Sequence, residues 1–402
     1  MKTNHLFFAT LAGCLLLAIL IPWYLWNIDS IRGELAFRVV ETETGKSSLL
    51  FVGDTHPGES YFLDSESKGR ENILETRGYS YSFRKLVPLL ESSGSVIANL
   101  ETPITADKGG LVGKPYNHWS SPRETPLLLR NAGIRIAALG NNHTMDQGAA
   151  GLVDTVDFLD RAGITWFGAG RDIREAYSPV IIRDAGHPEN VTAVISVFQY
   201  IKSYAREYEF YARNRKAGVA SARKQHVETA VKMIRDRYPD ALIVAFPHWG
   251  ANYQWRQEPQ KILAREFVDS GVDLVIGHGA HNLQEIEQYR NRLILYSIGN
   301  FVFNSRGRYR EMDSHPYSLM VKLETIKEGA SGTRRLTIYP IFSDNRTTQY
   351  QPRFTTIREF DECLELVQQK SSELGATPDM NLGQDSFGYF FQIDLALDGS
   401  PR

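Results

Sequence analysis

Cysteine is scarce in this sequence, and neither sign of charge predominates. Only two cysteines occur among the 402 residues, Cys14 in an N-terminal apolar stretch and Cys363 near the far end, which argues against a disulfide framework. The formal net charge is only -2, so no basic excess exists to neutralise the phosphates of a nucleic acid, and we expect no nucleic-acid partner. Internal repeats and low-complexity tracts are also absent. An apolar content of 42% over this length predicts one large globular domain, or a domain with an appendage.

The longest apolar run lies at the N-terminus. Residues 6–26 carry no charged side chain, and about 20 apolar residues suffice to cross the core of a bilayer. Three aromatic residues close the run, and Lys2 precedes it, which favours a cytoplasmic N-terminus. We therefore expect a transmembrane anchor over residues 1–26 in the cell membrane, with the main domain outside the cytoplasm. A cleaved signal peptide and a lipoprotein modified at Cys14 are alternatives that the sequence leaves open.

The rest of the chain has the pattern of an α/β domain. After an expected polar tether at 27–46, short apolar runs alternate with amphipathic stretches over 47–304, as βα units around a sheet do. A β-rich extension, packed on the same domain, is expected over 305–402. The predicted strands are 49–53, 96–100, 134–139, 192–198, 242–247, 274–276, 285–289, 293–297, 319–323, 336–341 and 389–395. The predicted helices are 83–92, 126–131, 149–162, 222–238, 261–270 and 357–374.

Five of the apolar runs are followed at once by side chains that can bind metals. These side chains are Asp54 and His56; Glu101; Asn142 and His143; His248; and His278 and His281. Ligands in α/β sheets collect beyond the carboxyl ends of the strands, so we expect the five segments to converge on one rim. Carboxylate, amide and imidazole groups are what a centre of two divalent metal ions needs for phosphate chemistry. The sequence therefore predicts such a centre.

Two features each have two interpretations. Asp146, three residues after His143, could orient that imidazole, or it could cap the helix that follows. The stretch 200–216 is rich in tyrosine and basic residues. It could form a lid that meets an anionic polymer or phosphate, or it could be an amphipathic surface helix.

Six motifs occur in an order that resembles a known family. They are G-D at 53–54, N-L-E-T-P at 99–103, N-N-H at 141–143 followed by Asp146, H-W-G at 248–250, G-H-G-A-H at 277–281 and Y-S-I-G-N-F at 296–301. Together they resemble the CapA family of capsule (poly-γ-glutamate) biosynthesis proteins, within the calcineurin-like metallophosphoesterase superfamily. The resemblance runs from about residue 48 to 304 and is weak beyond it.

This resemblance implies a four-layer α/β/β/α metallophosphoesterase-like sandwich with two divalent ions, Mn, Zn or Fe, above the inner strand ends. By position, Asp54 and His281 would serve one metal ion. Asn142, His248 and His278 would serve the other. The set depends on residues from four separate strand ends, so it is also a prediction about how the chain folds.

Three further positions take their roles from the same resemblance. Glu101 stands where the wider superfamily has a bridging aspartate. His143 matches the histidine that protonates the leaving group; from its place three residues later, we expect Asp146 to be the second catalytic residue if it orients His143. His56 restores the Asp-x-His pair of the superfamily, where CapA relatives more often carry a small or apolar residue, so it is either a ligand or a coincidence.

The function implied is that of an anchored, metal-dependent hydrolase of the phosphoesterase type, acting in biosynthesis of a capsule or other envelope polymer. Its expected partners are an anionic envelope polymer or a phosphoester substrate, and a membrane-bound polymer synthase complex. An accessory subunit that binds and exports or tethers the polymer without catalysis is the alternative. A phosphodiesterase acting on a soluble substrate is a third possibility.

Overall fold

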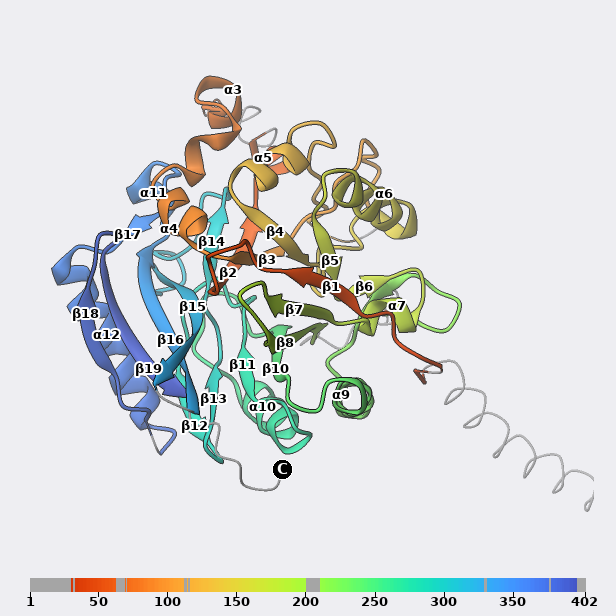
Figure 1. Cartoon of the computed structure of the whole chain (residues 1–402). Coiled ribbons are helices and arrows are strands. Elements are labelled where there is room, and N and C mark those ends of the chain that lie inside the picture. Colours follow the sequence, from red (N-terminus) through yellow and green to blue (C-terminus); the bar gives the residue numbers. More distant parts are fainter. Residues whose placement is uncertain are drawn as a thin grey trace, which may run out of the picture.

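The computed structural model describes residues 30–31, 33–62, 69, 71–111, 114, 116–199, 210–328, 331–375 and 377–395. The expected anchor at 1–26 lies outside these ranges, as do residues 200–209 of the aromatic and basic stretch. Within the described ranges, none of the helices combines the length and hydropathy that a bilayer span requires. The fold is mixed α/β, with two major sheets that lie against each other (Figure 1).

The first sheet has seven strands and is parallel at its centre. Its order is β1 (Arg38–Glu41), β7 (Val180–Asp184), β8 (His187–Phe198), β10 (Leu242–His248), β11 (Leu274–Ile276), β13 (Arg292–Leu295) and β12 (Ile286–Tyr289). Strands β8, β10, β11 and β13 run parallel, so their carboxyl ends reach the same edge. β1 falls within 27–46, where a tether is expected, and pairs with β7. The folded part therefore begins before residue 47.

The second sheet has ten strands and mixes the two halves of the chain. Its main order is β18 (Asn381–Gln384), β19 (Tyr389–Leu395), β16 (Ser331–Phe342), β15 (Tyr317–Glu328), β2 (Leu49–His56), β3 (Ser95–Leu100), β4 (Ile134–Ala138) and β5 (Thr165–Phe167). β14 (Asn300–Phe303) also pairs with β2, and β17 (Arg353–Phe354) pairs with β16. A separate ribbon joins β6 (Ala169–Gly170) and β9 (Gly218–Val219). The β-rich extension thus supplies strands of the same sheet as the N-terminal ones.

Apolar residues of both sheets meet in one core, exemplified by Phe51 of β2 and Phe246 of β10, whose rings lie 5.7 Å apart. Helices cover the outer face of each sheet. α4 (Val87–Ser92), α5 (Thr125–Asn131) and α6 (Gly148–Arg161) pack on the second sheet, and α9 (Lys224–Arg237) and α10 (Glu258–Asp269) pack on the first. The central strands of both sheets are thus buried on both faces. Because such strands appear in the sequence as continuous apolar runs, they were the easiest elements to predict.

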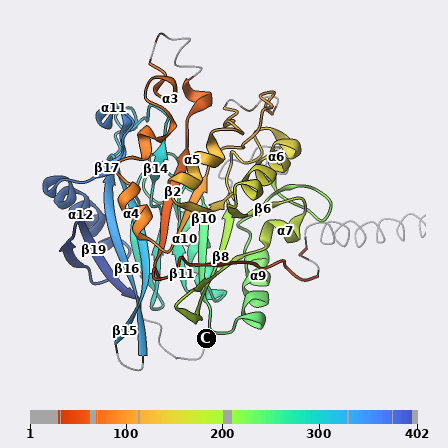
Figure 2. The same cartoon turned by 45° about the horizontal axis from the view of Figure 1, so that its top comes forward.

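Helix α12 (Ile357–Ser372) lies beside β16 and β19 (Figure 2), and it also contacts β12 of the other sheet. It inserts Phe360, Cys363 and Val367 into the core between the sheets. A reciprocal capping box between Thr356 and Glu359 starts the helix. The described part of the chain thus closes one end of the inter-sheet core with a helix from its last quarter.

The remaining elements are short, and one prediction over them was wrong. They are α3 (Ile73–Thr76), a 3-10 helix at Tyr79–Phe83, α7 (Ile173–Tyr177) and α11 (Asn345–Thr348). The sequence predicts one helix over 83–92, but the structure has the 3-10 turn and then α4, which begins at Val87. Pro88 lies in the first turn of α4, where its missing N–H costs no hydrogen bond.

Candidate metal centre

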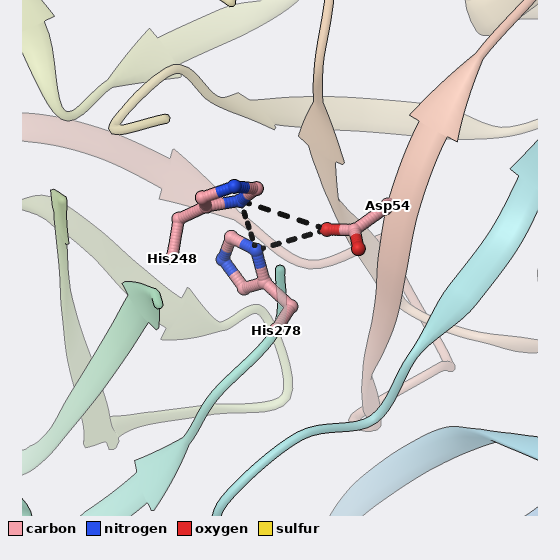
Figure 3. A group of neighbouring side chains, drawn as sticks. All are labelled: Asp54, His248 and His278. Atoms are coloured by element: carbon pink, nitrogen blue, oxygen red, sulfur yellow. Dashed lines mark hydrogen bonds and ion pairs between the residues drawn. The ribbon is translucent and has the colours of Figure 1, made fainter. Parts of the chain in front are cut away.

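The centre is built where β2 and β10 end and where the chain leaves β11. Asp54, His248 and His278 point toward one another there (Figure 3). The Oδ1 atom of Asp54 lies 3.2 Å from Nδ1 of His278 and 3.7 Å from Nδ1 of His248. The two imidazole Nδ1 atoms are 3.1 Å apart. One ligand atom of each residue lies within 4.8 Å of the others, so the three could hold a metal ion.

A second group of possible ligands shares Asp54. It consists of Asp54, Glu101 at the end of β3, and His281, again with ligand atoms within 4.8 Å. The Oδ2 atom of Asp54 lies 3.1 Å from Nδ1 of His281 and accepts a hydrogen bond from the Gly279 N–H at 3.1 Å. Glu101 Oε1 lies 3.8 Å from Nε2 of His248. Asp54 is thus positioned between two candidate metal positions.

Four buried side-chain atoms of the predicted metal ligands lack hydrogen-bond partners in the described part of the chain. They are both carboxylate oxygens of Glu101, Oδ1 of Asn142 and Nε2 of His278. Buried polar atoms are nearly always paired, so a cluster of unpaired ones needs an explanation. All four can act as metal ligands, and oxygen with imidazole nitrogen is a donor set that suits Mn, Zn or Fe. The residues therefore fit a metal centre.

The two carboxylates respond differently to burial. Burial by itself would raise the pKa of Asp54, but hydrogen bonds with His278 and His281 outweigh it and hold that pKa well below its usual range. Burial and the neighbouring charge of Asp54 raise the pKa of Glu101 well above its usual range. Among the described residues, none donates a hydrogen bond to Glu101 that would offset these two effects. A nearby cation would favour its ionised form, as cations do for any carboxylate.

His143 stands at the edge of the centre with a fixed orientation. Its Nδ1 lies 2.7 Å from Oδ2 of Asp146, and its Nε2 lies 3.7 Å from Glu101 Oε1. The bond to the carboxylate places the ring proton on Nδ1 and leaves the Nε2 lone pair facing the centre. Burial, with the charge of Lys114 second, lowers the pKa of His143 well below its usual value. The imidazole is therefore neutral at neutral pH.

Asp146 holds this arrangement together and does not cap a helix. Helix α6 has Gln147 as its N-cap, with no side-chain hydrogen bond to the helix. The carboxylate of Asp146 instead contacts His143 and the Lys114 ammonium, and it accepts a hydrogen bond from the His118 N–H at 2.6 Å. Of the two interpretations of Asp146, the structure has the one in which it orients His143.

His56 is buried beside the centre but belongs to none of the three groups of candidate ligands among the described residues, the third being His118, His143 and Asp146. Its Nδ1 accepts a hydrogen bond from the Gly58 N–H at 2.8 Å, and its Nε2 lies 3.5 Å from the Ser60 hydroxyl. The ring packs edge-on to His118, at 4.8 Å between centroids. Burial lowers the pKa of His56 to about 3, so the ring is neutral. In this geometry His56 supports the turn after β2.

Three further residues around the centre were not among the predicted site residues. Asn99 donates to Oδ1 of Asp54 at 2.9 Å, and Asn300 lies 2.9 Å from Nδ1 of His281. Both belong to motifs that the sequence singles out, so their place in those motifs was the signal. Lys114, which contacts Asp146 and donates to the Asn142 carbonyl at 2.7 Å, comes from a loop without such a signal.

Gly53 allows the close contact that positions Asp54. A Cβ atom at residue 53 would lie 1.8 Å from the carbonyl oxygen of Gly299. That same oxygen accepts a hydrogen bond from the Asp54 N–H at 3.0 Å. Since backbone cannot yield to such an overlap as a flexible side chain can, only glycine fits here.

A family model and several relatives match this chain. The model, described as bacterial capsule synthesis protein PGA_cap, matches residues 48–305. Capsule biosynthesis protein CapA of Bacillus anthracis is 29% identical over 289 residues, covering 70% of this chain and 66% of that protein. PGA biosynthesis protein CapA of Bacillus subtilis is 28% identical over 298 residues, covering 73% and 71%. This chain thus spans about two thirds of the length of these relatives.

Two more comparisons extend this set. A probable polyglutamine synthesis accessory protein of Mycobacterium tuberculosis is 30% identical over 264 residues, covering 63% of this chain and 67% of that protein. Among solved structures, one described as a novel phosphatase of Mycoplasma pneumoniae aligns with a TM-score of 0.35 and 11% identity. That alignment covers 78% of this chain and 96% of the other.

Proposed function

Because this chain belongs to the bacterial capsule synthesis protein family PGA_cap, we propose that it acts in the biosynthesis of a poly-γ-glutamate-type envelope polymer. Its reaction would be a metal-dependent hydrolysis of the phosphoester type, on a four-layer metallophosphoesterase-like sandwich. The proposed substrate is an anionic envelope polymer or a phosphoester, and the proposed partner is a membrane-bound polymer synthase complex.

We propose further that residues 1–26 anchor the protein in the cell membrane, with the main domain outside the cytoplasm. The uninterrupted apolar run at 6–26 supports this placement. We expect the full-length protein to stay in the membrane fraction when membranes are washed at alkaline pH. Release of the protein into the soluble fraction would contradict the anchor.

One observation carries the proposed reaction. Both carboxylate oxygens of Glu101 are buried without hydrogen-bond partners in the described part of the chain, and Oε1 lies 3.7 Å from Nε2 of His143, an imidazole whose orientation is fixed by a carboxylate. Unsatisfied buried ligand atoms support metal binding, and a fixed imidazole at their edge supports proton transfer. A merely structural metal site would not need the second feature.

Each residue then has a task. Asp54, Glu101, Asn142, His248, His278 and His281 would hold the metal ions. Divalent cations, when bound, polarise a phosphoryl oxygen and make water a stronger nucleophile at neutral pH. His143 would move a proton to or from the reacting oxygen at its Nε2 atom, and Asp146 keeps that atom facing the centre. Such proton transfer contributes roughly 10²- to 10⁴-fold to a rate.

The test of this proposal is turnover by the purified full chain. Phosphomonoesters and phosphodiesters are supplied with Mn²⁺ or Zn²⁺, and the metal content is measured in parallel. We expect hydrolysis that a chelator abolishes and that added metal restores. Metal-loaded protein that hydrolyses none of these esters faster than its Asp54→Ala variant would contradict the proposal.

One observation favours the second candidate, a non-catalytic accessory subunit that binds and exports or tethers the polymer. The side chains of Asp54, Glu101 and His278 have no exposed surface. His143 keeps 10% of its side-chain surface exposed and His281 11%. Such limited access suits a metal that stabilises the fold. Metal bound without any turnover, together with polymer binding, is the outcome that would favour this candidate.

A further inference from the structure

Three arginines lie in the loop that follows β14. Arg306, Arg308 and Arg310 are exposed, and they alternate with Gly307 and Tyr309, which are buried. The alternation brings the three guanidinium groups to the outer side of the loop. A short segment therefore presents three positive charges to solvent.

The loop is fastened to the metal centre by Tyr309. Its hydroxyl donates a hydrogen bond to the carbonyl oxygen of His281 at 2.9 Å and accepts one from the Asn300 side chain at 3.1 Å. Asn300 in turn lies 2.9 Å from Nδ1 of His281. The arginines are thus held on a segment that is bonded directly to a candidate ligand.

One of the three arginines, Arg308, lies close to a partly exposed candidate ligand of the centre. The guanidinium of Arg308 lies 5.6 Å from the centroid of the Tyr253 ring, which lies 5.7 Å from the ring of His281. The His281 side chain keeps 11% of its surface exposed, whereas Asp54 keeps none. A ligand that reaches the centre along His281 would therefore pass close to Arg308.

These charges are available to a ligand. Among the described residues, no carboxylate forms an ion pair with Arg306, Arg308 or Arg310. The nearby Glu311 carboxylate forms its ion pair with Arg346, although its pKa also responds to the charge of Arg306. Guanidinium groups bind carboxylates in a planar, two-bond geometry that ammonium groups cannot reproduce.

We infer that Arg306, Arg308 and Arg310 form a subsite for successive carboxylates of a linear acidic polymer, next to the metal centre. The inference rests on the proposed function, which supplies an anionic polymer as the substrate. It adds the surface that holds the polymer beside the metal centre. The polymer is recognised through repeated negative charge along one strand.

The experiment measures binding and needs no turnover. Fluorescently labelled poly-γ-glutamate is titrated with the full chain and followed by anisotropy at two salt concentrations. We expect the triple variant Arg306→Gln, Arg308→Gln, Arg310→Gln to bind at least about tenfold more weakly, as loss of hydrogen bonds to charged groups implies. The salt dependence of binding should also become shallower.

A matched control variant removes three positive charges at positions away from the loop. Lys232 and Arg237 of α9 and Arg358 of α12 are exposed on outer helices. Their triple change to glutamine should leave the affinity within about twofold, since surface charges away from a contact are largely screened. A third variant with lysine at 306, 308 and 310 keeps the charge and should bind with intermediate affinity.

The outcomes separate the two proposals. No polymer binding by the unaltered chain, or equal loss in both glutamine variants, would overturn the subsite. Equal affinity for polyphosphate, with equal dependence on the arginines, would overturn its assignment to carboxylates. Arginine-dependent binding without any ester hydrolysis would keep the subsite and contradict the hydrolytic function. Ester hydrolysis by a chain whose polymer binding does not depend on the arginines would keep the hydrolytic function and contradict the subsite.

Discussion

Replacing Asp54 by alanine is expected to lower metal affinity by at least about 100-fold, the upper end of the loss caused by removing even a residue that only supports a ligand. Asp54 belongs to two of the three groups of candidate ligands in the described part of the chain, so its loss affects two metal positions. It is also the carboxylate that His278 and His281 contact. Metal content after dialysis and titration with Mn²⁺ or Zn²⁺ are the measurements.

Two further variants make this result specific. Asp54→Asn keeps the shape of the side chain, including an oxygen for the Gly279 N–H, and removes the charge. It should bind metal weakly while staying folded. Asp273→Ala removes another buried aspartate, which is paired with Arg235 and Arg292. That variant should be less stable and keep its metal affinity. An Asp54→Ala protein that retains the metal content of the unaltered chain would refute the centre.

Replacing His143 by alanine should lower turnover by roughly 10²- to 10⁴-fold, the usual contribution of a positioned acid or base. Metal content should stay the same. The reason is geometric, because Nδ1 of His143 is committed to Asp146 and His143 belongs to neither group that contains Asp54. Steady-state kinetics on a phosphoester, with metal analysis on the same samples, measures both quantities.

The control for this variant is His226→Ala. That imidazole lies 3.0 Å from the Tyr177 hydroxyl and 3.2 Å from the Ser221 hydroxyl, in contacts that do not involve the centre. Its loss should leave kcat unchanged. If His143→Ala loses metal along with activity, His143 is a ligand. Partial recovery of the His143→Ala rate by added imidazole would support proton transfer at Nε2.

The parts of the centre that follow strand ends could be predicted from the sequence. β2, β3, β10 and β11 are buried along their whole length, and such strands appear as apolar runs with abrupt ends. Parallel pairing brings the ends of β10 and β11 to one edge of the first sheet and the ends of β2 and β3 to one edge of the second. The contact of Asp54 with His248 and His278 depends in addition on how the two sheets pack against each other, which periodicity does not give.

Contacts made by loops could not be predicted in the same way. Lys114 contacts Asp146, which is 32 residues further along the chain, and no motif around Lys114 predicts this contact. His56 gives the opposite lesson. The spacing Asp-x-His matches a metal-binding pair, but the turn after β2 leaves the Gly58 N–H buried, and His56 satisfies it. Buried backbone N–H groups need hydrogen-bond acceptors, and a sequence motif does not show which N–H groups the fold will bury.

Strand pairing at the sheet edges was also beyond the sequence. β1 has only four residues, and half of them are exposed. A short edge strand of this composition is not distinguishable from a polar linker by periodicity. Its assignment depends on pairing with β7, and the first pair joins Arg38 to Val180, 142 residues further along the chain.

The pairing of β15 with β2 has a consequence for how the protein must be made. The edge of β2 opposite β3 is paired by β14 at Asp54 and His56 and by β15 at Leu49–Phe51. β2 is therefore synthesised long before the two strands that cover this edge. Until then the edge is open, and an open edge is a template for pairing with other chains. A chain that ended at residue 305, where the family match ends, would keep β14 but leave Leu49–Phe51 unpaired on this edge, and we expect it to aggregate.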